Sequence, residues 1–380
     1  MHFETRAIHA GYDPFDHWGA VNPPVFLSST FAQSSPGKHQ GFEYARSGNP
    51  TRKALEDLLA NLEGGEHACA FSSGLGATDS IIKLLSSGDH CIVADDVYGG
   101  TFRIFDKTYR RFGIDFTFVD TTNPENVAAA IKDNTKMLFL ETPSNPLLKV
   151  SDIASLAKLA RDKGVISVVD NTFATPYLQR PLELGADIVM HSCTKYLGGH
   201  SDVVMGAAVT KESKLHERIA FNQNASGAVP GALDCYLVHR GIKTLGVRVD
   251  KSCDSAEQIV SFLLEHKRVT KVHYPALKEH VNHSIAEKQM KRFGAMISFE
   301  IDGSVADGEK VVSDRRVWTL GESLGGVESL LEHPASMTHA SIPKEMREKA
   351  GLRDGLIRLS VGIEDSRDLI EDLRKGLESY

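Results

Sequence analysis

Residues 164–195 read GVISVVDNTFATPYLQRPLELGADIVMHSCTK, and the pattern of this stretch decides the fold class. It holds two apolar runs of strand length, at 165–169 and 187–191, and polar residues follow each run at once. Runs that are apolar on both faces are typical of strands in a mostly parallel sheet with helices on both sides. The stretch therefore predicts an α/β fold.

The same kind of run recurs on either side of this stretch, with helical segments in between. The further runs are ACAF (68–71), HCIVA (90–94), FTFV (116–119), KMLFL (136–140) and VVMGAAV (203–209). A helix is indicated at 55–62, where leucines follow the spacing of an amphipathic helix. We expect a mostly parallel sheet of seven strands.

The pattern of predicted helices and strands changes at two places along the chain, which predicts an arm and two domains. Residues 1–50 have little periodicity and many turn-forming residues, so we expect an arm that packs on a neighbouring subunit. Residues 51–240 form the large domain. Residues 241–380, with strands at 295–301 and 356–361 and a final helix, form a smaller α+β C-terminal domain. A chain of 380 residues is also longer than a single core usually organises.

Composition argues against several classes of protein. The formal net charge is -7 and no basic stripe stands out, so we expect no nucleic acid partner. The apolar runs are too short to span a membrane, and the N-terminus shows no secretory signal. Five cysteines without a CxxC pair argue against disulfides and structural zinc, which favours a cytoplasmic protein. The sets His191, Cys193, His200 and His333, His339 lack the usual ligand spacing, so we expect no metal.

Ligands of open α/β sheets bind beyond the carboxyl ends of the strands, so the residues that follow each run are the candidates for a site. These segments are SSGLG (72–76), DDVYGG (95–100), ETPSNP (141–146), DNT (170–172) and SCTK (192–195). They bring hydroxyl, aromatic, acidic and lysine groups to one edge of the sheet. We therefore expect one site there.

Lys195 and Asp170 predict the chemistry of this site. A lysine amine forms an imine with an aldehyde, as pyridoxal 5'-phosphate (PLP) chemistry requires, although a surface lysine is the ordinary alternative. Asp170 ends an apolar strand, and a buried carboxylate there needs a partner. A protonated pyridine nitrogen supplies one, and a role as a helix cap is the alternative. The pair predicts PLP as the cofactor.

The phosphate of such a cofactor has a candidate site in Ser73, Gly74 and Leu75, which precede a predicted helix whose first N–H groups bind anions. Ser192 and Thr194 alternate around a cysteine, so both hydroxyls can face the same phosphate. A third glycine, which a dinucleotide-binding motif requires, is replaced by aspartate at 79, and this argues against a nicotinamide oxidoreductase.

Two further side chains have both a functional and an ordinary interpretation. Tyr98 could stack on the cofactor ring, or it could be a half-buried tyrosine. In LIRLSV (356–361), Arg358 and Ser360 share one strand face. An arginine on a strand can bind a carboxylate with two parallel hydrogen bonds, whereas a solvated sheet face is the alternative.

With these residues in place, the whole chain resembles the Cys/Met-metabolism (trans-sulfuration) family of PLP-dependent enzymes. The matching stretches are GFEYARSGNPTR (41–52), FSSGLGA (71–77), DDVYGGTFR (95–103), ETPSNP (141–146), VVDNTFATP (168–176), HSCTKYLGGHSDVV (191–204) and GESLGGVESL (321–330). The resemblance implies the type I, aspartate aminotransferase-like PLP fold. It also implies a homotetramer, a dimer of dimers whose active sites are shared across the dimer.

The resemblance also implies roles for individual residues. Lys195 would hold the cofactor and move protons, Asp170 would pair with the ring nitrogen, and Tyr98 would stack on the ring and act as an acid. The remaining roles are phosphate binding by Gly74, Leu75, Ser192 and Thr194, contact with the neighbouring subunit's phosphate by Tyr44 and Arg46, binding of the substrate α-carboxylate by Asn145, Ser323 and Arg358, and contact with the distal end of the substrate by Glu322 and Arg103.

The family members that the chain resembles most cleave L-cystathionine by γ-elimination, giving cysteine, 2-oxobutanoate and ammonia. The stretches at 36–52, 205–209 and 227–245 favour this lyase activity. The alternative is γ-replacement, as in cystathionine γ-synthases and O-acetylhomoserine sulfhydrylases, which the stretch at 321–335 resembles equally well. Methionine γ-lyases are disfavoured because they usually carry cysteine where this chain has Gly100.

Overall fold

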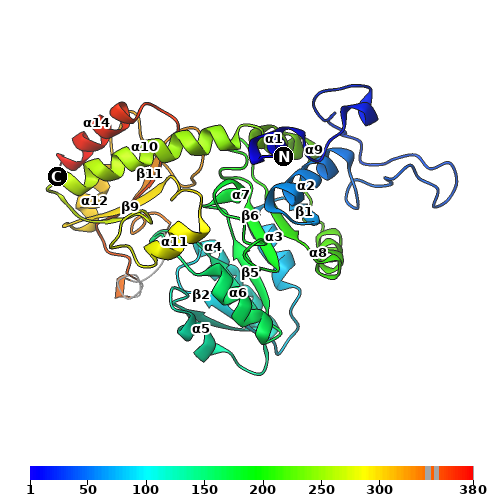
Figure 1. The fold of residues 1–380 in the computed structure, drawn as a ribbon, viewed down its shortest axis with the longest axis horizontal. Coiled ribbons are helices and arrows are strands. Elements are labelled where there is room, and N and C mark those ends of the chain that lie inside the picture. Colours follow the sequence, from blue (N-terminus) through cyan, green and yellow to red (C-terminus); the bar gives the residue numbers. More distant parts are fainter. Residues whose placement is uncertain (339–343, 346–350, 380) are drawn as a thin grey trace.

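The computed structural model describes residues 1–338, 344–345 and 351–379, whose strands form two sheets (Figure 1). The larger sheet has seven strands. In order across the sheet they are β1 (His67–Phe71), β7 (Gly206–Thr210), β6 (Ile188–Ser192), β5 (Ile166–Asp170), β4 (Thr135–Glu141), β2 (His90–Ala94) and β3 (Asp115–Val119). Strand β7 is antiparallel to both of its neighbours, and the other pairs are parallel. The predicted mostly parallel sheet is confirmed.

Helices cover both faces of this sheet because its central strands are apolar on both faces. One face packs against α3 (Gly74–Ile82) and α8 (Ser213–Ser226). The other face packs against α2 (Pro50–Glu63) near β1 and β7, and against α5 (Pro124–Ala130) and α6 (Ile153–Asp162) near β4 and β5. Parallel strands covered in this way end in a common edge, where the connecting loops meet.

The second sheet is smaller, with five strands in the order β10 (Thr319–Leu320), β11 (Leu330–Glu332), β12 (Leu356–Ser360), β9 (Met296–Ile301) and β8 (Val269–His273). It packs on the long helix α10 (Leu245–Glu265), with α14 (Ser366–Leu377) and α12 (Val305–Val312) nearby. Every residue of β12 is buried, so the solvated-face interpretation of Arg358 is wrong. The other α-helices of the described residues are α1 (Phe3–His9), α4 (Gly99–Phe102), α7 (Thr175–Leu178), α9 (Ala232–Ile242) and α11 (His283–Gln289).

Gly206 lets the loop before α3 pack directly on the sheet. A side chain at this first position of β7 would lie 2.2 Å from the carbonyl oxygen of Ser73, closer than a Cβ atom can approach. Helix α3 begins at Gly74, so Gly74 and Leu75, which were predicted to precede the helix, form its first turn, with Ser73 as the N-cap. The close packing therefore fixes the start of α3 at the carboxyl edge of the sheet.

The segment between α1 and α2 extends away from the rest of the chain (Figure 1). Its apolar side chains Phe15 and Trp18 are each 92% exposed. The segment is attached to α2 through Asn49, whose amide donates to the carbonyl of Phe26. In the described part of the chain, no helix is both long and apolar enough to cross a membrane.

Replacing Asn49 with alanine tests this attachment. The Asn49 side chain caps α2 by accepting from the N–H groups of Thr51 and Arg52, and it is 5% exposed. We expect N49A to lower the free energy of unfolding by about 1 to 2 kcal/mol, as loss of an N-cap does. Cleavage of the segment before α2 by a protease should become faster. The control N123A removes the cap of α5 alone, so equal cleavage in both variants would contradict this interpretation.

Candidate active site

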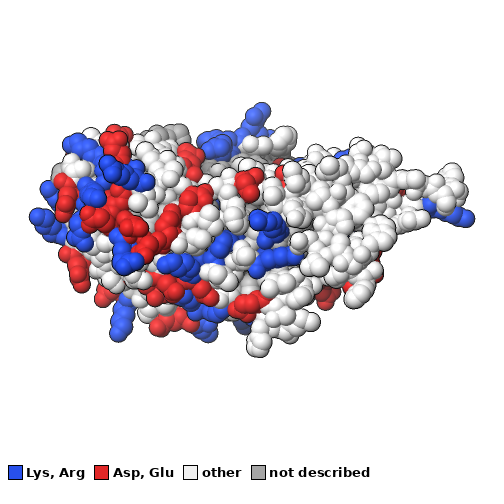
Figure 2. All heavy atoms as spheres, turned by 90° about the horizontal axis from the view of Figure 1, so that it is seen from above, with Lys and Arg blue, Asp and Glu red and all other residues white. Residues whose placement is uncertain are grey.

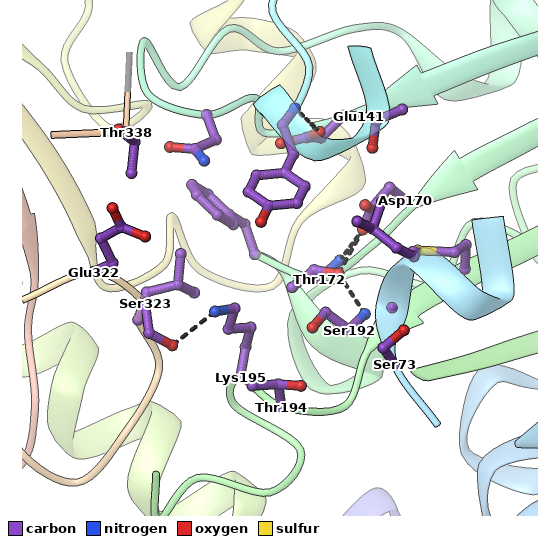
Figure 3. Close-up of a pocket in the computed structure, with 18 of the residues that line it drawn as sticks. Ser73, Glu141, Asp170, Thr172, Ser192, Thr194, Lys195, Glu322, Ser323 and Thr338 are labelled. Carbon is purple, nitrogen blue, oxygen red and sulfur yellow. Dashed lines mark hydrogen bonds between the residues drawn. The ribbon is translucent and has the colours of Figure 1, made fainter. Parts of the chain in front are cut away.

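A pocket of about 380 Å³ lies at the carboxyl edge of the larger sheet and is closed from the other side by residues around the second sheet (Figure 3). Residues from the two sheets face one another across it, with Asp170, Thr172 and Ser192 on one side and Glu322 and Ser323 on the other. The lining consists of Ser73, Gly74, Leu75, Tyr98, Thr101, Glu141, Asn145, Asp170, Thr172, Phe173, Met190, Ser192, Thr194, Lys195, Val204, Glu322, Ser323, Leu324, Thr338 and Arg358.

Lys195 lies between the two sides, three residues after the end of β6 (Figure 3). Its Nζ donates a 2.6 Å hydrogen bond to Oγ of Ser323. Burial, followed by the nearby guanidinium of Arg358, lowers the pKa of Lys195 to about 8. A neutral amine is the nucleophilic form of lysine, so this environment suits covalent attachment of an aldehyde.

Asp170 is the last residue of β5 and is 7% exposed. Its Oδ1 accepts hydrogen bonds from the N–H of Thr172 (3.0 Å) and from its hydroxyl (2.5 Å). The same hydroxyl accepts from the N–H of Ser192, which joins β5 to the loop that leads to Lys195. Within the described chain, no donor bonds to Oδ2, and this oxygen is available to a ligand. Thr172 was not predicted as a site residue, although its position two residues after Asp170 is typical of such a local bond.

The start of α3 supplies an anion site at the end of the pocket. The N–H groups of Gly74 and Leu75 belong to the first turn, where helix geometry leaves them without intrahelical partners. Glycine at 74 allows close approach, because a Cβ there would lie 3.0 Å from Cβ of Ser192. Ser73 itself uses its hydroxyl to accept from the N–H of Gly76. The hydroxyls of Ser192 and Thr194 also line the pocket.

Arg358 lies at the opposite end and is 3% exposed. It donates to Oδ1 of Asn145 and to the carbonyl of Ser323, both at 2.8 Å. Its Nη2 also lies 3.0 Å from a carboxylate oxygen of Glu332, which is fully buried. Ser323 has a φ of 90°, a conformation that favours glycine. The three carboxylate-binding residues predicted from the sequence therefore come together, with Glu332 as an additional partner that sequence reasoning missed.

Three predicted residues lie elsewhere. Of the described chain, the pocket lining does not include Tyr44, Arg46 or Arg103. Arg46 donates to the carbonyl and side chain of Asn224 and lies 5.5 Å from the ring of Tyr44. Arg103 is exposed at the start of a short π-helix. Their predicted roles, like the roles of the pocket residues, stay predictions.

The pocket fits PLP in three independent ways. The amine of Lys195 has a lowered pKa, one oxygen of the buried Asp170 carboxylate is available for a ring nitrogen, and a helix N-terminus can bind a phosphate. Among the described residues, no group of three or more His, Cys, Asp or Glu side chains could hold a metal ion. Of the histidines considered as metal ligands, His339 lies outside the described residues.

Comparisons with known proteins agree with this fit. The sequence model of the family described as "Cys/Met metabolism PLP-dependent enzyme" matches residues 4–378. The chain is 52% identical to a cystathionine β-lyase of Coxiella burnetii, over 99% of this chain and 98% of that protein. It is 50% identical to a cystathionine γ-synthase of Mycobacterium bovis, over 98% and 96% of the two chains.

A solved structure matches closely as well. The cystathionine γ-lyase of Lactobacillus plantarum, complexed with L-serine, superimposes with a TM-score of 0.97 at 48% identity. The match covers 100% of this chain and 99% of the other. The predicted type I fold and the predicted PLP cofactor are thereby confirmed.

The lowered pKa of Lys195 gives a testable pH dependence. Because only the neutral amine reacts with an aldehyde, attachment of PLP to the apoprotein should speed up as the pH rises through about 8, and then level off. The R358Q variant loses a cation beside Lys195, so the midpoint should move to higher pH, whereas R358K should keep it. The rate is measured by borohydride trapping and mass spectrometry. A midpoint near the ordinary lysine value of about 10.4 in the unmodified protein would contradict the assignment.

Proposed function

The chain belongs to the Cys/Met metabolism family of PLP-dependent enzymes, and from this premise we propose that it cleaves L-cystathionine by γ-elimination, as cystathionine γ-lyases do. The products are cysteine, 2-oxobutanoate and ammonia. The observation that carries the proposal is the carboxylate of Glu322, which lines the pocket next to Ser323. Cystathionine carries an amino-acid group at each end. A pocket lined by both a cation and a carboxylate matches such a substrate in charge.

The proposed roles at the reacting centre follow from the contacts in the pocket. Bound PLP supplies an electron sink for the electron pair left when a proton leaves Cα of the substrate. Asp170, through its available Oδ2, keeps the ring nitrogen protonated, and Tyr98 stacks on the ring. Gly74, Leu75, Ser192 and Thr194 hold the phosphate, and Ser73 fixes the start of α3.

Substrate binding in this proposal begins with Arg358, Asn145 and Ser323, which hold the α-carboxylate. The bond from Nζ of Lys195 to Ser323 places the amine beside this carboxylate site. Lys195 removes the proton from Cα and then helps to remove a proton from Cβ. The bond between Cγ and sulfur breaks afterwards. Tyr98 donates the proton that the departing cysteine thiolate needs. The four-carbon remainder is released as 2-oxobutanoate and ammonia after reaction with water.

Two other outcomes use the same first step. The 52% identity to a cystathionine β-lyase favours β-elimination as a second candidate, which would give homocysteine, pyruvate and ammonia from the same substrate. The 50% identity to a cystathionine γ-synthase favours γ-replacement, in which a thiol adds at Cγ. The products therefore distinguish the three activities directly.

We further propose that residues 1–50 form an arm over a neighbouring subunit of a homotetramer, a dimer of dimers, while 51–240 and 241–380 form the two domains. Phe15, Trp18 and Leu233 are more than half exposed, and Figure 2 shows few charged side chains on the part of the surface that carries the arm. A partner subunit would cover this apolar surface. Tyr44 and Arg46 then reach the phosphate of the partner's site, and Arg103 contacts the distal end of the substrate.

The five buried free thiols support a reducing, cytoplasmic location.

The substrate assignment is tested by product analysis and by Glu322. Incubation with L-cystathionine should release cysteine and 2-oxobutanoate in equal amounts, whereas homocysteine and pyruvate would contradict γ-elimination. Turnover only of O-acylhomoserine with cysteine would contradict any lyase activity.

We expect E322A to raise KM for cystathionine about tenfold to a hundredfold, as loss of a charge-assisted hydrogen bond does. Homoserine, which lacks the distal ammonium, should be affected little. The control E328Q changes a glutamate that bonds Ser201, outside the pocket.

The shared site is tested by mixing two inactive variants. K195A lacks the attachment lysine but supplies Arg46, and R46A supplies Lys195 but lacks the arginine. If Arg46 acts on the neighbouring subunit, random hybrid dimers at equal amounts should recover about a quarter of the activity, because half of the dimers are hybrids with one intact site. If Arg46 acts within its own chain, mixing recovers nothing. PLP-dependent absorbance and subunit exchange, followed by native mass spectrometry, serve as controls.

A further inference from the structure

Glu141 and Asp170 are two carboxylic acids on the same edge of the sheet. They end the neighbouring parallel strands β4 and β5, and the strand register places them directly opposite each other. Adjacent strands lie about 4.8 Å apart, so the two side chains start at that separation. Both residues line the pocket, and they are 5% and 7% exposed. Water therefore screens the repulsion between two negative charges here only weakly.

The charged groups that act on Glu141 in the described structure are mainly other acids. Asp170 from β5 and Asp96, a buried carboxyl that follows β2, are the acidic groups whose charges act on it. Arg358 is the cation whose charge Glu141 influences, but its guanidinium is already engaged by the side chain of Asn145 and the carboxylate of Glu332. In the described part of the chain, neither Glu141 nor Asp170 has an ion-pair partner.

Both acids accept N–H hydrogen bonds, which favour the ionised form, so the burial of each acid and the charge beside it indicate which one holds the proton. Thr172 donates to Asp170 twice, through its N–H and its hydroxyl, and these bonds stabilise the ionised form. Burial raises the pKa of Asp170, but these bonds and the charge of His191 oppose the shift. Burial, followed by the charge of Asp170, raises the pKa of Glu141 well above its ordinary value. When two coupled acids differ in this way, the less stabilised one keeps the proton.

We propose that Glu141 is a positioning residue that remains a neutral carboxylic acid, so that the wall facing the cofactor ring carries one negative charge, on Asp170. Its Oε2 accepts a 2.7 Å hydrogen bond from the backbone N–H of Tyr98. Glu141 therefore fixes the backbone of the residue that is predicted to stack on the ring. This inference rests on the PLP cofactor and not on the proposed substrate, so it holds for each of the three candidate reactions.

A neutral Glu141 has a consequence for the substrate as well. A second negative charge on this wall would act on Arg358 and would oppose the binding of a substrate carboxylate there. The single charge on Asp170 suffices to balance a protonated ring nitrogen. The neutral acid thus keeps the hydrogen bond to Tyr98 without adding charge to the pocket.

Infrared difference spectroscopy of the holoenzyme tests the protonation state directly. At neutral pH the unmodified protein should show the carbonyl stretch of a protonated carboxylic acid, shifted in heavy water, and E141Q should lack the contribution of one such group. The control E56Q changes another glutamate with a raised pKa, which bonds the backbone of Ala70 away from the pocket. It should leave the Glu141 band and PLP binding unchanged.

Cofactor binding supplies the second readout. We expect E141Q to bind PLP within about threefold of the unmodified protein, because an amide oxygen can still accept from Tyr98, and E141A to bind about tenfold more weakly. If the E141Q difference spectrum instead shows loss of a carboxylate band, or if E141Q weakens PLP binding more than about tenfold, the proposal is overturned. Should E141Q not fold, a spectrum of the unmodified holoenzyme without any protonated carboxyl band at neutral pH overturns it equally.

Discussion

The hydrogen bond between Nζ of Lys195 and Oγ of Ser323 is the contact on which the site depends, because it joins a loop of the larger sheet to a loop beside the smaller one. Ser323 also presents its carbonyl to Arg358, so one residue sets the distance between the amine and the guanidinium. Two cations buried close together destabilise one another, and the lysine can respond by losing its proton. The same arrangement that packs the two sheets therefore prepares the amine for covalent chemistry.

One ion pair at the pocket is already formed within the protein. Arg358 is neutralised by Glu332 across the strand pair β11 and β12 before any substrate arrives. In the proposed function a substrate carboxylate is therefore bound largely by the donors of Arg358, which Asn145 and Ser323 already orient, and only partly by net charge. Preorganised donors cost no rearrangement at the moment of binding, and this is where an active site gains most from a rigid scaffold. On the facing wall, the hydrogen bonds from Thr172 likewise orient the Asp170 carboxylate before a ring nitrogen binds.

The sequence predicted the larger sheet well because its strands are buried on both faces, which leaves continuous apolar runs that polar residues end abruptly. Lys195 and Asp170 were found for the same reason, since each follows or ends such a run. The strand at Leu330–Glu332 gave no signal because it has only three residues, and Glu332 was missed with it. Arg358 allowed two interpretations because alternation along a strand does not reveal what covers the polar face. Glu141 was noted within its motif but given no role, because the pairing of β4 with β5 is not visible in the sequence.

In the proposed function, the reaction that follows the first proton transfer depends on where the pocket holds the leaving group of the substrate. In the proposed function Lys195 acts through a flexible side chain beside Ser323, which suits the transfer of protons at both Cα and Cβ of a bound amino acid. The pairing of Asp170 and the placement of Arg358 are common requirements of β-elimination, γ-elimination and γ-replacement. In the proposed function these outcomes differ in where the pocket holds the leaving group, and Glu322, which lines the pocket beside Ser323, is the residue proposed to hold it. In the proposed function one α-carboxylate site serves all three reactions, which is consistent with relatives that share about half of their residues with this chain and bear the names of different activities.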